Sequence, residues 1–140
     1  MKNLRSVLLA LTVLLLATAA QAQTTNVKAS IPFDFVVGDH AYTPGEYTVK
    51  SVSQGSAAIR IDSADESEKG ITLSNACSKA QPAVGTTLVF HRLGNNYFLY
   101  QIWTEGNSAG RQFRVSEKEV QLAKNYSNPE LVIVAANISH

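Results

Sequence analysis

The segment TLVFHRLGNNYFLYQIWT, residues 87–104, decides the fold class. Aliphatic and aromatic residues fill its two arms, which flank Gly94-Asn95-Asn96, and this composition is typical of β-strands. Glycine and asparagine tolerate the positive φ angles that a tight turn requires. The segment therefore predicts a β-hairpin in which residues 87–93 pair with residues 97–104.

The rest of the chain repeats this pattern of apolar strands and turns, with turn residues at intervals of about ten residues. Further strands are predicted near residues 31–37, 47–49, 59–61, from Gly70 onward, and at 131–136. The first of these alternates between an apolar set (Ile31, Phe33, Phe35 and Val37) and the residues between them. We expect an all-β domain: an antiparallel meander of about seven strands that closes as a small barrel or folds over as a sandwich. The pattern does not choose between barrel and sandwich.

One short helix interrupts the strands. Ser116-Glu117-Lys118-Glu119 has the S-x-x-E form of a capping box, which predicts a helix start, and Asn128-Pro129 follows its end near Lys124. We expect Val120, Leu122 and Ala123 to form its apolar side. Alternation in residues 97–104 places Leu99 and Trp103 on one face, and Phe98, Tyr100 and Ile102 on the other. The helix is expected to cover the face that the core leaves open.

The beginning of the chain has the form of a secretory signal peptide. Lys2 and Arg5 precede an apolar run over residues 7–17, and Ala20-Gln21-Ala22 is an A-x-A cleavage site. The run is shorter than the roughly 20 residues of a membrane helix. We expect residues 1–22 to be removed and residues 23–140 to form a single secreted or periplasmic domain without a membrane span.

Charge and cysteine content exclude some partners. Removing residues 1–22 leaves ten basic and eleven acidic residues, spread along the chain, and this pattern argues against nucleic acid as a partner. Cys77 is the only cysteine, so no internal disulfide forms. Because Ile71, Leu73 and Cys77 share one side of an extended segment, we expect Cys77 to be buried and reduced.

The mature chain resembles a family of small secreted proteins that is common in acidobacteria. The resemblance rests on five motifs: IPFDFVVGD (31–39), PGEYTV (44–49), LVFHRLG (88–94), YFLYQIW (97–103), and GR followed by S-x-x-E-x-x-L-A (110–123). It implies an exported, compact, β-rich protein, and it assigns no reaction, ligand or site residue.

Residue patterns with catalytic or metal-binding potential are few. Gly106-Asn107-Ser108-Ala109-Gly110 matches G-x-S-x-G, but no helix follows the serine at once and His140 is the only histidine downstream. His40 and His91 have no metal-ligand spacing. Asp62, Asp65, Glu66 and Glu68 are calcium-ligand candidates, although their spacing is not that of an EF-hand and a solvated loop is favoured. We expect no cofactor and no catalytic site.

The aromatic residues are typical of a β core, and Trp103, Tyr100 and Phe98 are the candidates for ligand contact. The sequence favours a non-catalytic binding or interaction module outside the cytoplasm, with a small apolar ligand or a protein as its partner. The alternative is a structural cell-envelope protein that acts through self-association at exposed strand edges. A small hydrolase that uses Ser108 is the third hypothesis.

Overall fold

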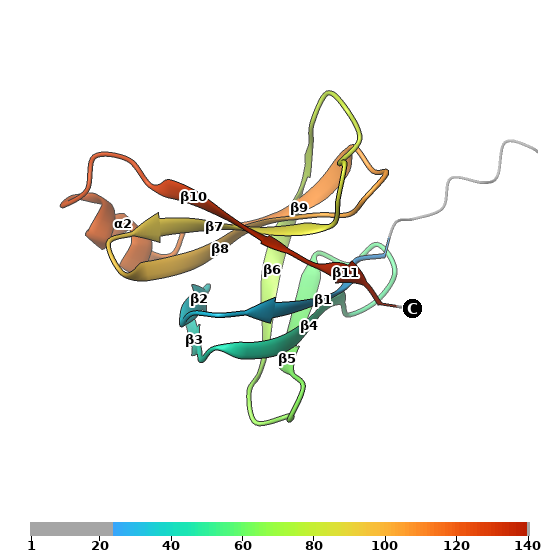
Figure 1. Ribbon diagram of the computed structural model, residues 1–140, viewed down its shortest axis with the longest axis horizontal. Helices are drawn as coiled ribbons and strands as arrows, with labels where there is room; N and C mark the ends of the chain where they lie inside the picture. Colours follow the sequence, from blue (N-terminus) through green and yellow to red (C-terminus); the bar gives the residue numbers. More distant parts are fainter. Residues whose placement is uncertain (1–23, 140) are drawn as a thin grey trace, which may run out of the picture.

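The computed structural model describes residues 24–139 (Figure 1). The predicted signal peptide, its cleavage site before Gln23, and His140 lie outside the described residues. The elements, in chain order, are β1 (Asn26–Ile31), β2 (Phe35–Val37), β3 (His40–Tyr42), β4 (Gly45–Ser51), β5 (Ala58–Ser63), β6 (Lys69–Ser78), β7 (Thr87–Leu93), β8 (Asn96–Trp103), β9 (Ala109–Phe113), α2 (Glu117–Ala123), β10 (Glu130–Ala135) and β11 (Asn137–Ile138).

The mainly β fold class is confirmed, but the simple antiparallel meander is wrong. Ladders join the strands in the order β10-β7-β8-β9-β6-β5-β4-β1-β11, so β6 pairs with β9 instead of β7. In addition, β2 pairs parallel with β8, which makes the sheet mixed. Residues 24–139 hold eleven strands rather than about seven. The single strand predicted near residues 31–37 is wrong, because it divides into the end of β1 and β2, and β3, β9 and β11 are short strands that the sequence did not predict.

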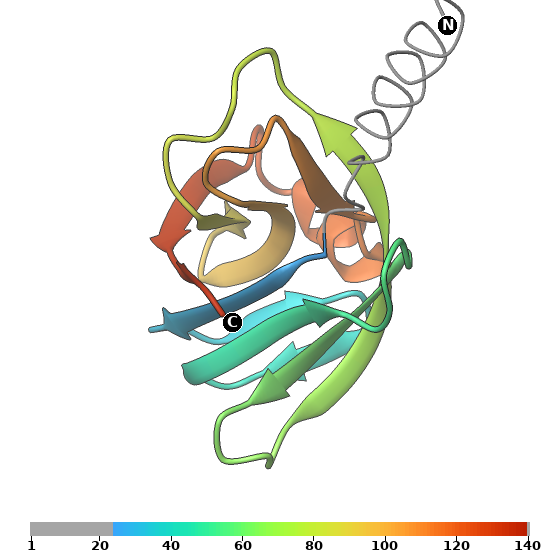
Figure 2. The same ribbon diagram turned by 90° about the vertical axis from the view of Figure 1, so that its right-hand side faces the viewer.

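Strand β6 joins the two parts of the sheet. Its first half pairs with β5 and its second half, from Ser74 to Ser78, pairs with β9. Figure 2 shows β6, in yellow-green, running along the right side of the molecule, with most of the other strands to the left of it. The long connection over residues 79–86 then leads from the end of β6 to β7.

The curled sheet stays open between β1 and β10. β1 pairs with β4 along its whole length, but its ladder with β11 covers Val27 and Lys28 only. The same register, continued, would bring Pro32 opposite Ile133. The ladder already ends at Lys28, and Pro32, which has no N–H to donate, could not complete a pair with Ile133.

Aromatic side chains fill the interior. Phe35 stacks on Tyr42, with ring centroids 5.0 Å apart, and lies edge-on to Tyr47 and Phe90. All four residues are at most 3% exposed. The predicted inward set is confirmed for Ile31, Phe35 and Val37, which are buried, while Phe33 is partly buried against the same core.

A β-bulge in β8 changes which side chains share a face. Val89 is opposite Gln101 and Phe90 is opposite Leu99, so Tyr100 is an extra residue on β8. Leu99 and Ile102 therefore both reach the main core, whereas Trp103 lies in a second cluster. The prediction that Leu99 and Trp103 share a face is wrong, because alternation cannot reveal an inserted residue.

Helix α2 begins where the capping box predicts it. The Ser116 hydroxyl accepts a hydrogen bond from the Glu119 N–H at 3.2 Å. Instead of returning to the cap, the Glu119 carboxylate contacts Nδ1 of His91 on β7 at 2.5 Å. The predicted apolar side is wrong for Val120, which is 49% exposed, and for Ala123, which is exposed too, because the helix turns Glu119 toward β7; Leu122 is partly buried. Across residues 24–139, no helix combines the length and apolar character needed to cross a bilayer.

Candidate functional site

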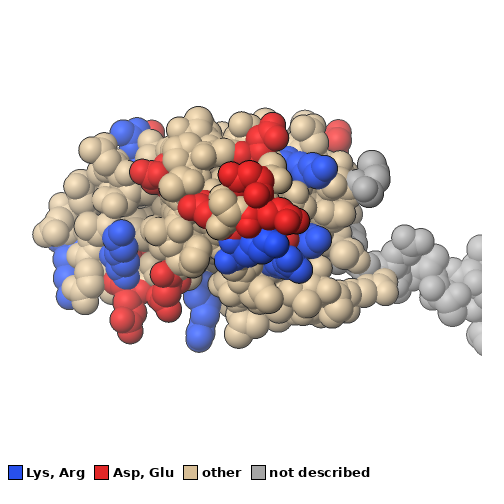
Figure 3. All heavy atoms as spheres, turned by 90° about the horizontal axis from the view of Figure 1, so that it is seen from below, with Lys and Arg blue, Asp and Glu red and all other residues tan. Residues whose placement is uncertain are grey.

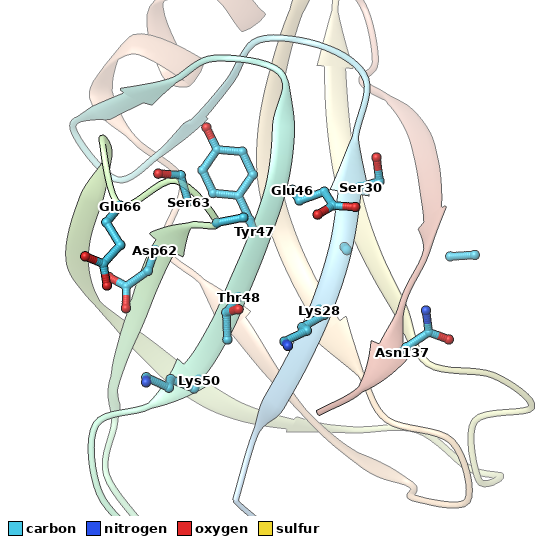
Figure 4. Close-up of a pocket in the computed structure, with 13 residues that line it drawn as sticks. Lys28, Ser30, Glu46, Tyr47, Thr48, Lys50, Asp62, Ser63, Glu66 and Asn137 are labelled. Carbon is cyan, nitrogen blue, oxygen red and sulfur yellow. The ribbon is translucent and has the colours of Figure 1, made fainter. Parts of the chain in front are cut away.

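The outer surface of β1, β4 and β5 carries a broad polar groove (Figure 4). Val27, Val49 and Ile61 point into the core, so the residues that alternate with them point outward. The outer groove, as we call it, has a volume of about 640 Å³. It is lined by Lys28, Ala29, Ser30, Glu46, Tyr47, Thr48, Lys50, Asp62, Ser63, Ala64, Glu66, Ala135 and Asn137.

Strand register fixes the order of charges in the outer groove. Lys28 lies opposite Thr48, so its diagonal neighbours on β4 are Lys50 and Glu46. Figure 4 shows Lys28, Thr48 and Lys50 at one end of the groove, and Glu46 with Ser30 at the other. The groove therefore has a cationic end and an anionic position that are diagonal neighbours across β1 and β4, roughly 7–8 Å apart.

Some of these charges are neutralised within the protein and some are not. Asp62 pairs with Arg60 at 2.8 Å, and Glu66 pairs with Lys69 at 3.8 Å. Within residues 24–139, no ion pair involves Lys28, Lys50 or Glu46. Figure 3 shows acidic and basic side chains gathered side by side on the face that carries β4 and β5. The unpaired charges are available to a ligand.

The four calcium-ligand candidates are not brought together around one point. Asp62 pairs with Arg60, and Asp65 accepts hydrogen bonds from the hydroxyls of Ser63 and Ser67 at 2.7 and 2.6 Å. These hydrogen bonds, that of Ser67 first, lower the pKa of Asp65 to about 2. In the part of the chain that the structure describes, no group of three or more His, Cys, Asp or Glu side chains is arranged to hold a metal ion.

Glu68, the last of the four candidates, links the polar loop to Thr43 and to the buried Tyr47. Its carboxylate contacts the Tyr47 hydroxyl and accepts a hydrogen bond from the Thr43 N–H at 3.1 Å. The contact with Tyr47 is the main cause that lowers the pKa of Glu68. Burial, followed by the Glu68 contact, raises the pKa of Tyr47 to about 12. The role of Glu68 is to hold residues 43–47 against the loop.

We expect Glu68 to make the protein sensitive to acid. Because its pKa is lower in the folded state, Glu68 stabilises the fold above its ordinary pKa of about 4.3, and this contribution is lost as the pH falls. The free energy of unfolding, measured by urea titration between pH 7 and pH 3, should fall less in Glu68→Gln than in the unchanged protein. Glu46→Gln, at an exposed position without an ion pair, is the control. In this variant the free energy of unfolding should fall between pH 7 and pH 3 by as much as in the unchanged protein. An equal loss of the free energy of unfolding between pH 7 and pH 3 in all three proteins would contradict this role for Glu68.

The three aromatic ligand candidates do not form an open platform. Phe98 is 2% exposed and Trp103 is 7% exposed. The Trp103 ring packs with Ala83 and Val89, and the Lys79 ammonium lies 4.4 Å from the ring centroid. Tyr100 stacks on His91 with centroids 3.9 Å apart. These side chains stabilise the outer side of the β7–β8 hairpin.

The serine of the G-x-S-x-G match lies in an exposed connection before β9. Its carbonyl accepts a hydrogen bond from the Lys79 N–H, and its hydroxyl makes no hydrogen bond within residues 24–139. His91 is held by Glu119 and Tyr100, while His140 lies outside the described residues. The described geometry shows no base positioned for Ser108.

Cys77 is partly buried rather than fully buried. It packs beside Trp103, whereas Ile71 and Leu73 are 67% and 64% exposed, so the expected common buried side is wrong. The reason is that β6 changes partners at Ser74, where its buried side changes as well.

We expect the Cys77 thiol to react slowly. Burial raises the pKa of this thiol, so less of it is present as the reactive thiolate at pH 8. Labelling by a thiol reagent should be at least about tenfold slower in the folded protein than in denaturant. Equal rates in both conditions would overturn this expectation.

Sequence reasoning missed the outer groove. The alternation of Lys28 with Val27 and Ala29, and of Glu46, Thr48 and Lys50 with Tyr47 and Val49, is a signal that these polar residues face outward. It does not reveal that β1 and β4 are neighbours. Comparison with known protein families, curated proteins and solved structures gives no match for this chain. The resemblance to small acidobacterial proteins therefore stays a prediction.

Proposed function

We propose that this protein is a non-catalytic binding module that acts outside the cytoplasm and binds a short, extended peptide in the outer groove. The observation that carries the proposal is the set of unpaired charges, Lys28, Lys50 and Glu46, arranged across two neighbouring strands. The location follows from the predicted signal peptide at residues 1–22.

A peptide that carries both signs of charge is the ligand that fits this arrangement. Its acidic group would lie against Lys28 and Lys50, and its basic group against Glu46. Ser30, Thr48 and Asn137 add hydrogen-bonding groups along the groove. An apolar ligand is disfavoured here because the aromatic core fills the interior and the groove lining is charged.

Binding is also favoured over catalysis by the chemistry of the groove. Its described lining contains no histidine or cysteine, and its tyrosine, Tyr47, is buried and carries a raised pKa. General acid–base catalysis near neutral pH needs a group that titrates close to the working pH. The groove offers fixed charges and hydrogen bonds, which position a ligand.

The test is calorimetric titration with synthetic pentapeptides of three kinds: mixed charge, all acidic and all basic. The mixed-charge peptides should bind most tightly, and binding should weaken as salt is raised from 50 to 500 mM. The double variant Lys28→Gln, Lys50→Gln should weaken binding by at least about tenfold. Lys124→Gln, at the end of α2 and outside the groove, should leave it unchanged.

Two results would overturn the proposal. One is the absence of binding by every peptide at millimolar concentration. The other is binding that the Lys28 and Lys50 substitutions do not alter, because the ligand would then lie outside the outer groove.

A further inference from the structure

Strand β10 lies at the open end of the strand path and carries two exposed apolar side chains. Leu131 is 60% exposed and Ile133 is 66% exposed, while Val132 and Val134 pack against the core. The strand from Leu131 to Ala135 has no charge and no proline. A strand edge of this kind is a template for pairing with another strand.

Hydrogen-bond directions show which backbone groups of β10 are free. The Ala136 N–H donates to the Thr86 carbonyl, so the even-numbered residues of this segment point their backbone groups toward β7. The backbone groups of Leu131 and Ile133 therefore point to the opposite edge. Within residues 24–139, no ladder or backbone hydrogen bond satisfies them there, because the ladder between β1 and β11 covers Val27 and Lys28 only and β1 ends at Ile31.

We propose that this edge binds the same edge of a second copy of the chain. A two-fold axis at Val132 would pair the strands antiparallel and bring Leu131 of each copy opposite Ile133 of the other. Both residues have their N–H and C=O groups on the free edge, so each such pair exchanges both hydrogen bonds. Their exposed side chains then lie next to each other on one face, which buries apolar surface.

Charge is compatible with this symmetric pairing. Glu130 is the charged residue of β10, and it contacts Arg92 of its own chain at 3.7 Å. Under the two-fold axis the two Glu130 residues are four positions apart along the paired strands, or roughly 14 Å. That distance exceeds the Debye length of about 10 Å at 0.1 M salt, so their repulsion is screened. A self-complementary apolar edge without charge conflict favours a second copy over a partner of opposite charge.

Sedimentation equilibrium on the protein as its own cells produce it tests the proposal. A reversible dimer is expected, and Ile133→Lys should raise its dissociation constant at least about a hundredfold, because the apolar contact is lost on both copies. Ile71→Lys is the matched control, since Ile71 is 67% exposed on β6, and should change the constant by less than about threefold. Circular dichroism should show that both variants are folded. A monomer at all concentrations, or equal effects of the two variants, would overturn the proposal.

Disulfide cross-linking tests the register itself. In a Cys77→Ser background, Leu131→Cys and Ile133→Cys chains are oxidised separately and as a mixture. Paired residues that exchange hydrogen bonds have Cα atoms about 5.5 Å apart, which suits a disulfide. Covalent dimer should form mainly in the mixture. Equal yields in the separate samples, or no cross-link in any sample, would contradict the two-fold pairing at Val132. Neither experiment depends on the outer groove.

Discussion

Replacing Gly110 by alanine is expected to lower the free energy of unfolding by about 3 kcal/mol. Gly110 pairs with Trp103 and with Cys77, and it lies beneath the indole ring. A Cβ atom at this position would be 2.6 Å from the Ile102 carbonyl oxygen and 2.7 Å from the nearest ring carbon of Trp103. Because one of these contacts is backbone, the strand itself would have to move.

Gly85→Ala is the control for this substitution. Gly85 lies in the connection over residues 79–86, and no atom is within 4 Å of the position that its Cβ would occupy. Alanine there is expected to change the stability by less than about 0.5 kcal/mol. Urea denaturation of the two variants compares them directly, and similar stability of Gly110→Ala and Gly85→Ala would contradict the close packing of Trp103 on Gly110.

The local features of the fold could be predicted from the sequence. Gly94 has a φ of 62°, which agrees with the turn predicted between β7 and β8. Ser116 caps the helix where the S-x-x-E pattern places it. Both signals depend on residues within a few positions of each other, so they can be identified from the sequence alone.

The features that sequence reasoning missed depend on distant parts of the chain. The extra residue at Tyr100 is visible only through the pairing of β8 with β7. The change of partner at Ser74 depends on β9, which lies more than thirty residues later. Glu119 fits a capping box by its spacing, but its carboxylate is taken by His91, 28 residues away in sequence. A local pattern cannot report such a competition.

The same limit applies to the candidate site. The acidic run from Asp62 to Glu68 is a calcium-site candidate in the sequence because its charges are close together along the chain. In the structure its members contact separate partners. Lys28 and Lys50 are far apart in sequence, and it is the pairing of β1 with β4 that makes them neighbours. Charges that remain unpaired after folding are therefore a better guide to this site than charge density along the chain.

Trp103→Ala is expected to lower the free energy of unfolding by about 4 kcal/mol, the largest effect among the substitutions considered. The indole is covered by the connection over residues 79–86 through Ala83, and it rests on Val89 and Gly110. Its Nε1–H donates to the Gln101 side chain at 3.1 Å, and Gln101 in turn donates to Gln112 at 2.9 Å. Truncation would leave a cavity and an incomplete hydrogen-bond chain on this side of the sheet.

Lys79→Ala separates the packing of the ring from the cation above it. An exposed cation–π contact contributes about 0.5–1 kcal/mol, so this variant should lose far less stability than Trp103→Ala. Because the indole also shields Cys77, Trp103→Ala should speed thiol labelling in the folded state, whereas Lys79→Ala should not. If urea denaturation gives a loss under about 1 kcal/mol for Trp103→Ala, the indole does not stabilise the fold. Trp103 would then be a contact residue for a ligand or partner, which is the role that tryptophan commonly has at binding surfaces.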